Sequence, residues 1–190
     1  KDFQEFYRKT EEYYSKIVGG IENRRAFVPY NHSDGIPNVL IAYIGDVAVA
    51  CAGFKPYSND DAEIKRVWVE PDYRGRHIAK DLMKQIEDRA REFGYKRTIL
   101  QTRAIMADAV GLYEKLGYSK IENYPPYDNL VGAVCMAKKS VKNGIYYMLC
   151  NNGPQPPSLW TKRTDNQRKR KPWKIRNIFL KKIIYRMRWE

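Results

Sequence analysis

The sequence predicts an α/β or α+β domain built around a sheet of mixed strand direction. Apolar residues recur at three-to-four spacing in three segments, which indicates amphipathic helices, and short apolar runs between these segments indicate strands. Along the chain the order is helix, hairpin, strand, helix, strand, helix, hairpin, without an internal repeat. A chain of 190 residues accommodates one such domain, with residues left over.

The N-terminal part begins with a helix over residues 2–17, which ends at a glycine pair at positions 19–20. Gly45-Asp46 separates two strand-like runs and has the length and chemistry of a two-residue hairpin turn. Because Lys1 already lies in the helical pattern, we expect the native start, and a first strand with it, to be missing. The predicted strands of this part are residues 39–44, 47–54 and 62–69.

A second helix follows the third strand, with an apolar stripe that begins at Ile78 and a glycine stop at Gly94. A third helix covers residues 107–116 and ends at Gly117. The remaining predicted strands are residues 96–102, 118–124 and 131–137. Because the pattern degrades after these strands, we place one domain at residues 1–140 and an extension at residues 141–190.

The turn between the third strand and the second helix is the strongest candidate for a ligand site. The strand stops at Pro71, and Arg74-Gly75-Arg76 leads into the helix. The first N–H groups of a helix lack intrahelical partners and carry partial positive charge, so an anion placed there meets donors and a favourable dipole. Gly75 lets the backbone approach a ligand closely. The turn therefore predicts a phosphorylated ligand, although the two arginines also fit ordinary surface charges.

Positive charge is concentrated in the extension. Residues 141–190 carry 13 of the 35 Lys and Arg but two of the 22 Asp and Glu, so they hold most of the formal net charge of +13. Interleaved aromatic residues suit a nucleic-acid-binding arm, and the four-residue spacing of Ile175, Phe179, Ile183 and Met187 suits a basic helix on an anionic membrane. The simpler interpretation is an extension that is either disordered or partly helical and has no binding role.

The cysteine pattern and the hydropathy predict a cytoplasmic location. Cys51, Cys135 and Cys150 lack CxxC spacing, and two of them lie in apolar strand-like runs, so we expect buried free thiols in a reducing compartment. No apolar run approaches the length of a membrane span, and the N-terminus lacks a signal-peptide core. The sequence implies no metal site and leaves the oligomeric state open, with a dimer as one option.

Two motifs make residues 62–137 resemble the GCN5-related N-acetyltransferase (GNAT) superfamily. The first signature of that family is a strand, then Arg or Gln, two variable residues, Gly, one variable residue, and Gly or Ala. Here it reads Arg74-Gly75-Arg76-His77-Ile78-Ala79, with His77 in place of the usual second glycine. The second signature reads Leu112-Tyr113-Glu114-Lys115-Leu116-Gly117-Tyr118, and the Asn often found seven residues before Tyr113 is Met106.

The resemblance implies a mixed, mostly antiparallel sheet that is flanked by helices and splayed at its central strands. It also implies acetyl-CoA as the acyl donor. By this analogy the main chain of Val67, Trp68 and Val69 holds the pantetheine arm and the thioester. The pyrophosphate would lie on the turn residues Arg74, Gly75, Arg76, His77, Ile78 and Ala79. A side chain at residue 77 is expected to crowd the pyrophosphate and to require a negative φ.

The reaction that the resemblance implies is acetyl transfer to an amine by direct attack in a ternary complex. Glu63 stands eleven residues before Arg74, the offset of the catalytic glutamate in the histone-acetylating branch, and is the predicted base. Glu63 fits equally an ion pair with Lys65 or Arg66 on a strand surface. Tyr113 matches the general acid of the family, whereas its place on an apolar stripe fits an ordinary core tyrosine.

Tyr124 and Tyr127 lie between the final two strands, where related enzymes form part of the acceptor pocket, and Asp128 is suited to attract a cationic amine. Composition alone favours a packed turn for this segment. The predicted acceptor is a small-molecule or peptide amine. Two other functions stay open: a non-catalytic acyl-CoA-binding module, or a protein that binds nucleic acid or an anionic membrane through its basic extension.

Overall fold

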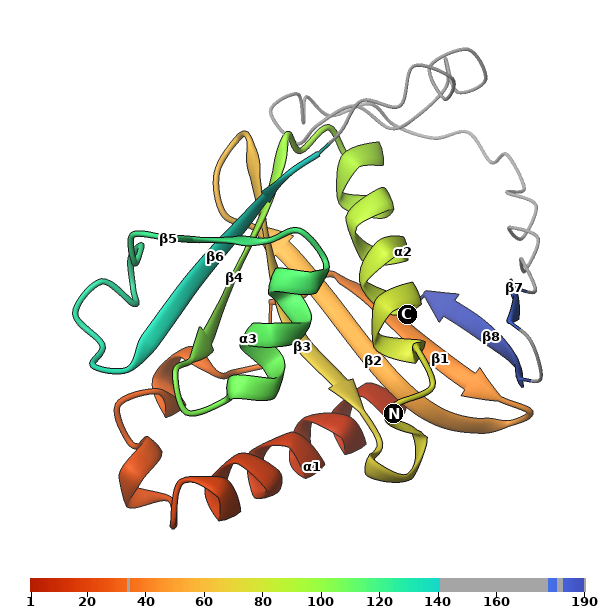
Figure 1. Cartoon of the computed structure of the whole chain (residues 1–190), viewed down its shortest axis with the longest axis horizontal. Coiled ribbons are helices and arrows are strands. Elements are labelled where there is room, and N and C mark those ends of the chain that lie inside the picture. The colour runs from red at the N-terminus through yellow and green to blue at the C-terminus, as the bar shows by residue number, and fades with distance from the viewer. Residues whose placement is uncertain (34, 141–177, 181–182, 190) are drawn as a thin grey trace, which may run out of the picture.

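The structure is a computed structural model that describes residues 1–33, 35–140, 178–180 and 183–189. In these residues eight strands form one sheet, in the order β5-β6-β4-β3-β2-β1-β8-β7 (Figure 1). The strands are β1 (Asn38–Ile44), β2 (Val47–Pro56), β3 (Asp61–Val69), β4 (Arg97–Arg103), β5 (Ser119–Ile121), β6 (Ala133–Lys139), β7 (Ile178–Leu180) and β8 (Ile183–Trp189). Among the described pairs β3 and β4 are parallel and the others antiparallel, which confirms the predicted mixed, mostly antiparallel sheet.

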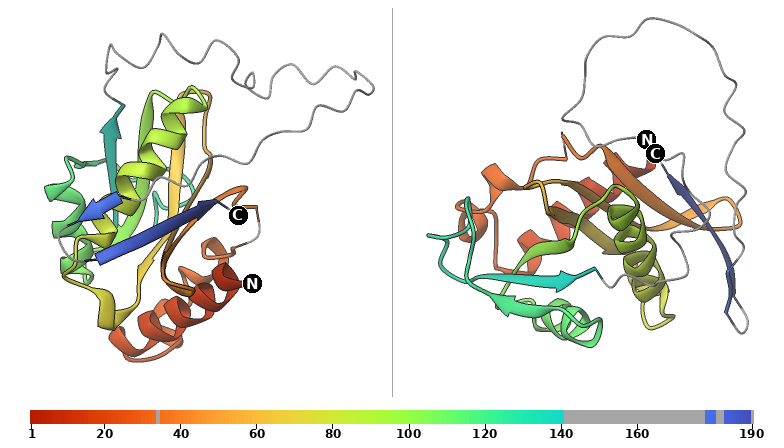
Figure 2. Two further views of the ribbon diagram at one scale, coloured as in Figure 1. Left: turned by 90° about the vertical axis from the view of Figure 1, so that its right-hand side faces the viewer. Right: turned by 90° about the horizontal axis from the view of Figure 1, so that it is seen from above.

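Helices cover both faces of this sheet (Figure 2). The helices are α1 (Asp2–Ile17), α2 (Ile78–Glu92) and α3 (Ala107–Lys115), with short 3-10 turns η1 (Glu22–Arg24), η2 (Val28–Tyr30) and η3 (Pro71–Tyr73). Successive residues of β1 point to opposite faces, so Leu40 packs in the core beneath α2 and Ile41 packs in the core beneath α1. The central strands are therefore buried on both sides.

The parallel pair at the centre of the sheet is short. Residues 61–64 of β3 pair with residues 97–100 of β4, and no pairing between the two strands continues beyond Ile64 and Leu100. Residues 65–69 of β3 still pair with β2 on their other edge. The splay predicted for the central strands lies at this point, and it leaves one backbone edge of β3 open.

The structure contains the predicted hairpin at Gly45-Asp46, whereas the strand predicted at residues 118–124 is shorter than expected. Gly45 has a φ of +58°, which suits the tight turn between β1 and β2. By contrast β5 is limited to three residues, Ser119–Ile121, where the sequence suggested a strand as far as residue 124. The two prolines at 125 and 126 lack backbone N–H groups, so this segment favours a loop over a longer ladder.

The extension contributes strands where it is described. Residues 183–189 form β8, which pairs antiparallel with β1, so the prediction of a helix is wrong for this segment. Pairing with β8 satisfies main-chain groups on the outer edge of β1, a gain that a helix does not provide. The basic run at 162–174 and Cys150 lie outside the described residues. Within the described chain, no helix combines the length and apolar character needed to span a bilayer.

Candidate active site

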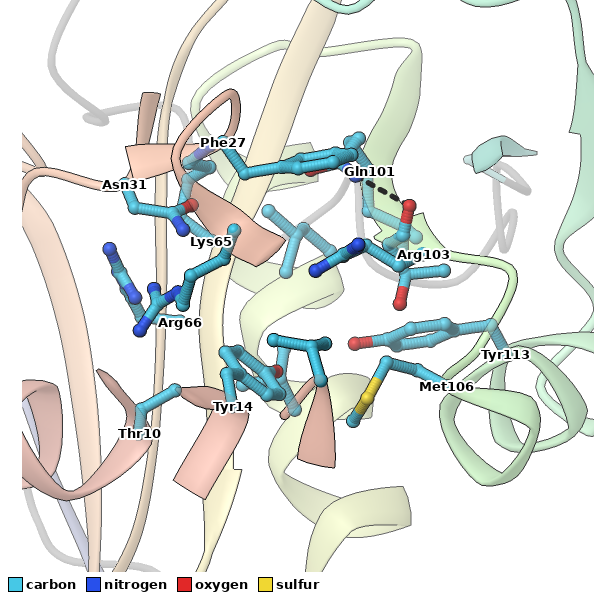
Figure 3. A pocket seen from close by; sticks show the side chains of 16 residues that line it. Thr10, Tyr14, Phe27, Asn31, Lys65, Arg66, Gln101, Arg103, Met106 and Tyr113 are labelled. Carbon is cyan, nitrogen blue, oxygen red and sulfur yellow. Dashed lines mark hydrogen bonds between the residues drawn. The ribbon is translucent and has the colours of Figure 1, made fainter. Parts of the chain in front are cut away.

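A cleft opens where β3 and β4 separate (Figure 3). Its lining residues come from α1, the segment containing η1 and η2, β3, β4 and α3. Val67, which lies in the part of β3 that does not pair with β4, lines the cleft. The side chains of Trp68 and Val69 are buried, neither residue is part of the described cleft lining, and the Val69 carbonyl accepts a hydrogen bond from Arg74 at 3.0 Å. Of the three predicted pantetheine residues, the structure therefore places Val67 at the cleft.

Tyr113 joins the core and the cleft. Its side chain is 8% exposed, and its ring packs against Tyr118 with the ring centroids 5.9 Å apart. Its hydroxyl points into the cleft from α3 (Figure 3). Burial raises the pKa of Tyr113 above its usual value, so the hydroxyl keeps its proton at neutral pH, as a general acid must. The structure thus gives Tyr113 a ring that packs in the core and a hydroxyl that faces the cleft.

Glu63 lies in a buried polar network beside the cleft and is absent from the described cleft lining. Its carboxylate is 1% exposed, accepts a 2.8 Å hydrogen bond from the Tyr127 hydroxyl, and lies 3.4 Å from the amines of both Lys55 and Lys65. Lys65 itself lines the cleft, and its amine donates to the Tyr127 hydroxyl at 2.6 Å. Burial lowers the pKa of Lys65 below its usual value, and the charge of Glu63 opposes this effect. Lys65 therefore connects the Glu63 carboxylate to the cleft, because Lys65 pairs with Glu63 and lines the cleft.

The predicted acceptor residues divide between this network and the surface. Tyr127 is 2% exposed, and Tyr124 also donates to the Glu63 carboxylate, at 3.3 Å. Burial, with a further contribution from the Glu63 charge, raises the pKa of both tyrosines. Asp128 is exposed and accepts a hydrogen bond from the Asn129 amide at 3.0 Å. The structure thus gathers Tyr124, Tyr127 and Glu63 behind the cleft and leaves Asp128 outside it.

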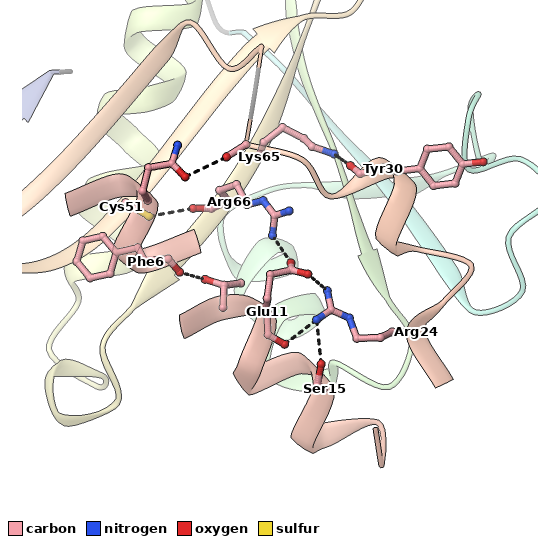
Figure 4. A network of polar contacts seen from close by, with 11 residues as sticks. Phe6, Glu11, Ser15, Arg24, Tyr30, Cys51, Lys65 and Arg66 are labelled. Carbon is pink, nitrogen blue, oxygen red and sulfur yellow. Dashed lines mark hydrogen bonds and ion pairs between the residues drawn. The ribbon is translucent and has the colours of Figure 1, made fainter. Parts of the chain in front are cut away.

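A second polar network borders the cleft near α1 (Figure 4). The Glu11 carboxylate pairs with Arg24 and, at 2.8 Å, with Arg66. Arg66 lies in a β-bulge of β3, where the register against β2 shifts, and has a φ of +58°. Its side chain is 5% exposed, so the bulge places a buried cation at the wall of the cleft.

Tyr14, Arg66 and Arg103 are among the cleft residues that sequence reasoning did not identify as part of a site. Tyr14 lies on α1, within the helix predicted over residues 2–17. One signal was present: Tyr13 and Tyr14 are adjacent, so both cannot occupy the centre of one helical stripe. Tyr13 packs edge-on against Trp68, with ring centroids 5.2 Å apart, and Tyr14 faces the cleft.

The turn before α2 has the features of an anion site. Gly75 has a φ of +74° with open space where a side chain would be, and the first N–H groups of α2 lack intrahelical acceptors. Arg74 donates to the Val69 carbonyl at 3.0 Å and to the Tyr13 hydroxyl at 2.9 Å, so part of its guanidinium holds the turn. Arg76 and His77 are exposed, and Ala79 is partly buried in the first turn of the helix, next to the buried Ile78.

His77 adopts a left-handed backbone conformation, which glycine adopts more readily than other residues. Its φ is +63°, so the expectation of a negative φ is wrong. The chain reverses into α2 at this residue, and the geometry of the turn prevails over the mild preference of a side chain for negative φ. A left-handed conformation outside glycine costs on the order of 1 kcal/mol.

His77→Gly is therefore expected to leave the free energy of unfolding within about 0.5 kcal/mol of wild type, because relief of strain offsets the added freedom of the unfolded chain. His77→Val is expected to lower it by about 1–2 kcal/mol, since β-branched side chains tolerate positive φ poorly. Urea unfolding of both variants measures the difference. Equal stability of the two variants would contradict the left-handed conformation.

The sheet splays between two parallel central strands, and a glycine-containing turn leads from the first of them into a helix, as the resemblance to N-acetyltransferases implies. The chain belongs to the acetyltransferase (GNAT) family, whose family model matches residues 3–118. This match confirms the resemblance drawn from the two motifs.

Curated relatives match part of the chain. The uncharacterized N-acetyltransferase YjgM of Escherichia coli K12 is 35% identical over 86 residues, which are 44% of this chain and 51% of the relative. The [ribosomal protein bS18]-alanine N-acetyltransferase of the same organism is 30% identical over 82 residues, 41% of this chain and 55% of the relative. The chain thus spans about half the length of the curated relatives it matches.

Solved structures share the fold at low sequence identity. A GNAT-family acetyltransferase from Staphylococcus aureus Mu50 superimposes with a TM-score of 0.56 at 16% identity, over 72% of this chain and 90% of that one. The PaiA N-acetyltransferase from Thermoplasma acidophilum, solved in complex with coenzyme A, gives a TM-score of 0.57 at 16% identity, over 73% of this chain and 93% of that one.

Proposed function

We propose that this protein transfers the acetyl group of acetyl-CoA to a primary amine of a small molecule or peptide, by direct attack in a ternary complex. Acetyl-CoA is the acyl donor of the family to which the chain belongs. The single observation that carries the proposal is the Tyr113 hydroxyl, which points into a cleft bordered by the open edge of β3.

The structure fits the donor at two places. The open edge of residues 65–69 offers main-chain groups to the pantetheine amides, and the turn at Gly75 offers free space beside helix N–H groups to the pyrophosphate. When bound, acetyl-CoA supplies a thioester that an amine attacks, with a thiol as the leaving group. Neither Cys nor Ser is among the described residues that line the cleft, which favours direct attack over an acetylated enzyme.

The acceptor amine must lose a proton. A lysine-like amine has a pKa near 10.4, so deprotonation at pH 7 costs about 4.6 kcal/mol. We assign Glu63 as the base, acting through Lys65. The Lys65 ammonium gives a proton to the Glu63 carboxylate, 3.4 Å away, and the Lys65 amine takes a proton from the acceptor ammonium in the same step. The lowered pKa of Lys65 favours this transfer. Tyr113 protonates the departing thiolate.

Location is a further part of the proposal. Cys135 carries a buried free thiol, which supports a reducing compartment and hence the cytoplasm.

A free-thiol assay with acetyl-CoA tests the function, using polyamines, amino acids, aminoglycosides and peptides as acceptors. We expect thiol release that depends on an amine, with the acetylated amine identified by mass spectrometry. Thermal stabilisation by CoA without thiol release from any acceptor would instead support a non-catalytic acyl-CoA-binding module. Absence of both effects would overturn the proposal.

A further inference from the structure

The charges around the cleft do not balance. Four cationic side chains line it, and the described lining contains no Asp or Glu; the four are Arg24, Lys65, Arg66 and Arg103. The Glu11 carboxylate forms ion pairs with both Arg24 and Arg66. The Glu63 carboxylate forms ion pairs with both Lys65 and Lys55. Each carboxylate therefore neutralises one of two cations, which leaves surplus positive charge at the wall.

Arg103 is the cation with the least compensation. Its guanidinium projects into the cleft and stacks on Phe27, 4.4 Å from the ring centroid (Figure 3). Its contact with protein oxygen is a 3.4 Å hydrogen bond to the Asn23 carbonyl, and no carboxylate within the described chain forms an ion pair with it. Burial, reinforced by the nearby charge of Arg24, lowers the pKa of Arg103, as expected for a cation without an anionic partner.

Arg66, which also lines the cleft, has hydrogen-bond donors without acceptors. Its Nη1 pairs with Glu11, whereas its Nε and Nη2 are buried and have no acceptor among the described residues. Buried donors without acceptors carry a free-energy cost that a nearby anion reduces. A polyamine or aminoglycoside would add positive charge to this environment, whereas a carboxylate would neutralise part of the surplus charge and accept hydrogen bonds from the unpaired donors.

We propose that the acceptor carries a carboxylate next to its amine, as an α-amino acid does, and that Arg103 binds this carboxylate. The inference rests on the proposed function and specifies its acceptor. Guanidinium groups recognise carboxylates through paired hydrogen bonds, which orients the amine as well as holding it. The remaining cations lower the pKa of the bound ammonium, so the same charges that attract the carboxylate assist deprotonation of the amine.

The test compares matched acceptors in the thiol-release assay. Alanine, leucine and phenylalanine are each paired with the corresponding amino alcohol and with the amine that lacks the carboxylate. We expect kcat/KM to be at least about tenfold higher for the amino acids. In Arg103→Gln the ratio should fall to about threefold or less, and Arg103→Lys should retain an intermediate ratio. Arg25→Gln is the matched control, because Arg25 is exposed, pairs with Glu22 at 3.5 Å and lies outside the cleft lining.

The outcomes separate this inference from the proposed function. Thiol release that is equal for acids, alcohols and amines would overturn the carboxylate site and leave acetyl transfer standing. If no amine releases thiol, titration calorimetry of the same amino acids and amines in the presence of CoA decides the inference separately. Binding of the acids that weakens in Arg103→Gln supports the carboxylate site, and equal binding of acids and amines rejects it.

Discussion

Tyr113→Phe is expected to lower kcat by at least about tenfold and to leave the affinity for CoA within about twofold of wild type. The ring that packs against Tyr118 is retained, so the substitution removes the hydroxyl that points into the cleft and little else. A CoA thiolate has a pKa near that of a cysteine thiol, about 8.5, so protonation assists its departure at neutral pH. Because burial raises the pKa of Tyr113, no loss of kcat from ionisation of this residue is expected below about pH 10.

Steady-state kinetics with saturating acceptor measures the effect, and titration with CoA measures affinity. Tyr118→Phe is the matched control: Tyr118 is buried beside Tyr113, but its hydroxyl forms a 2.9 Å hydrogen bond with Thr98 and lies outside the cleft lining. It should cost about 1 kcal/mol of stability and leave kcat within about twofold. Equal kcat for wild type and Tyr113→Phe would remove Tyr113 from the mechanism.

Local sequence patterns predicted the order of the elements because each pattern depends on neighbouring residues. The two-residue turn at Gly45-Asp46 and the stripe that starts at Ile78 are of this kind. The turn at Arg74–Ala79 was also found locally, because the chemistry of a helix N-terminus is contained in a few consecutive residues. The family match at residues 3–118 supports the motifs that were found there.

The cationic wall of the cleft depends on distant residues and was not predicted. Arg24 and Arg103 are almost eighty positions apart, and both line the cleft that opens where β3 and β4 diverge after four paired residues. The error at β8 has a different cause. Ile183 and Met187 are four positions apart, a spacing that places residues on one face of a helix and equally on one face of a strand. The open edge of β1, which is not visible in the sequence, favours the strand.

Glu63→Gln is expected to lower the free energy of unfolding by about 3 kcal/mol, because it leaves a buried lysine without its anion. Lys65 is 9% exposed and Glu63 1% exposed, so water screens this charge poorly. Lys55→Gln is the control and should cost less than about 1 kcal/mol, since Lys55 is 39% exposed. Adding Lys65→Met to Glu63→Gln should restore stability, because an apolar side chain then replaces the unpaired charge.

The dependence of this loss on pH identifies the charge responsible. Because the pKa of Lys65 is lowered in the folded state, the unfolded state binds its proton more tightly, and stability rises with pH between the two pKa values. Glu63 opposes the lowering, so its removal moves the folded-state pKa further down. Urea unfolding should therefore show a difference between wild type and Glu63→Gln that narrows as the pH rises towards the ordinary pKa of a lysine, about 10.4. If the difference in free energy of unfolding between wild type and Glu63→Gln does not change with pH, the loss of stability does not arise from the charge of Lys65.

The same variant tests the proposed proton transfer, which stability alone does not address. If Lys65 passes the proton of the acceptor to Glu63, Glu63→Gln lowers kcat at pH 7 by about 10²-fold. The loss should shrink as the pH approaches the pKa of the acceptor, because the amine then arrives unprotonated and needs no base. Measurement of kcat from about pH 6.5 to about pH 9.5, at a temperature where the variant is folded, distinguishes the two roles. A ratio of kcat values that stays near one across this range would show that the network of Glu63, Lys65 and Tyr127 supports the wall of the cleft and takes no part in proton transfer.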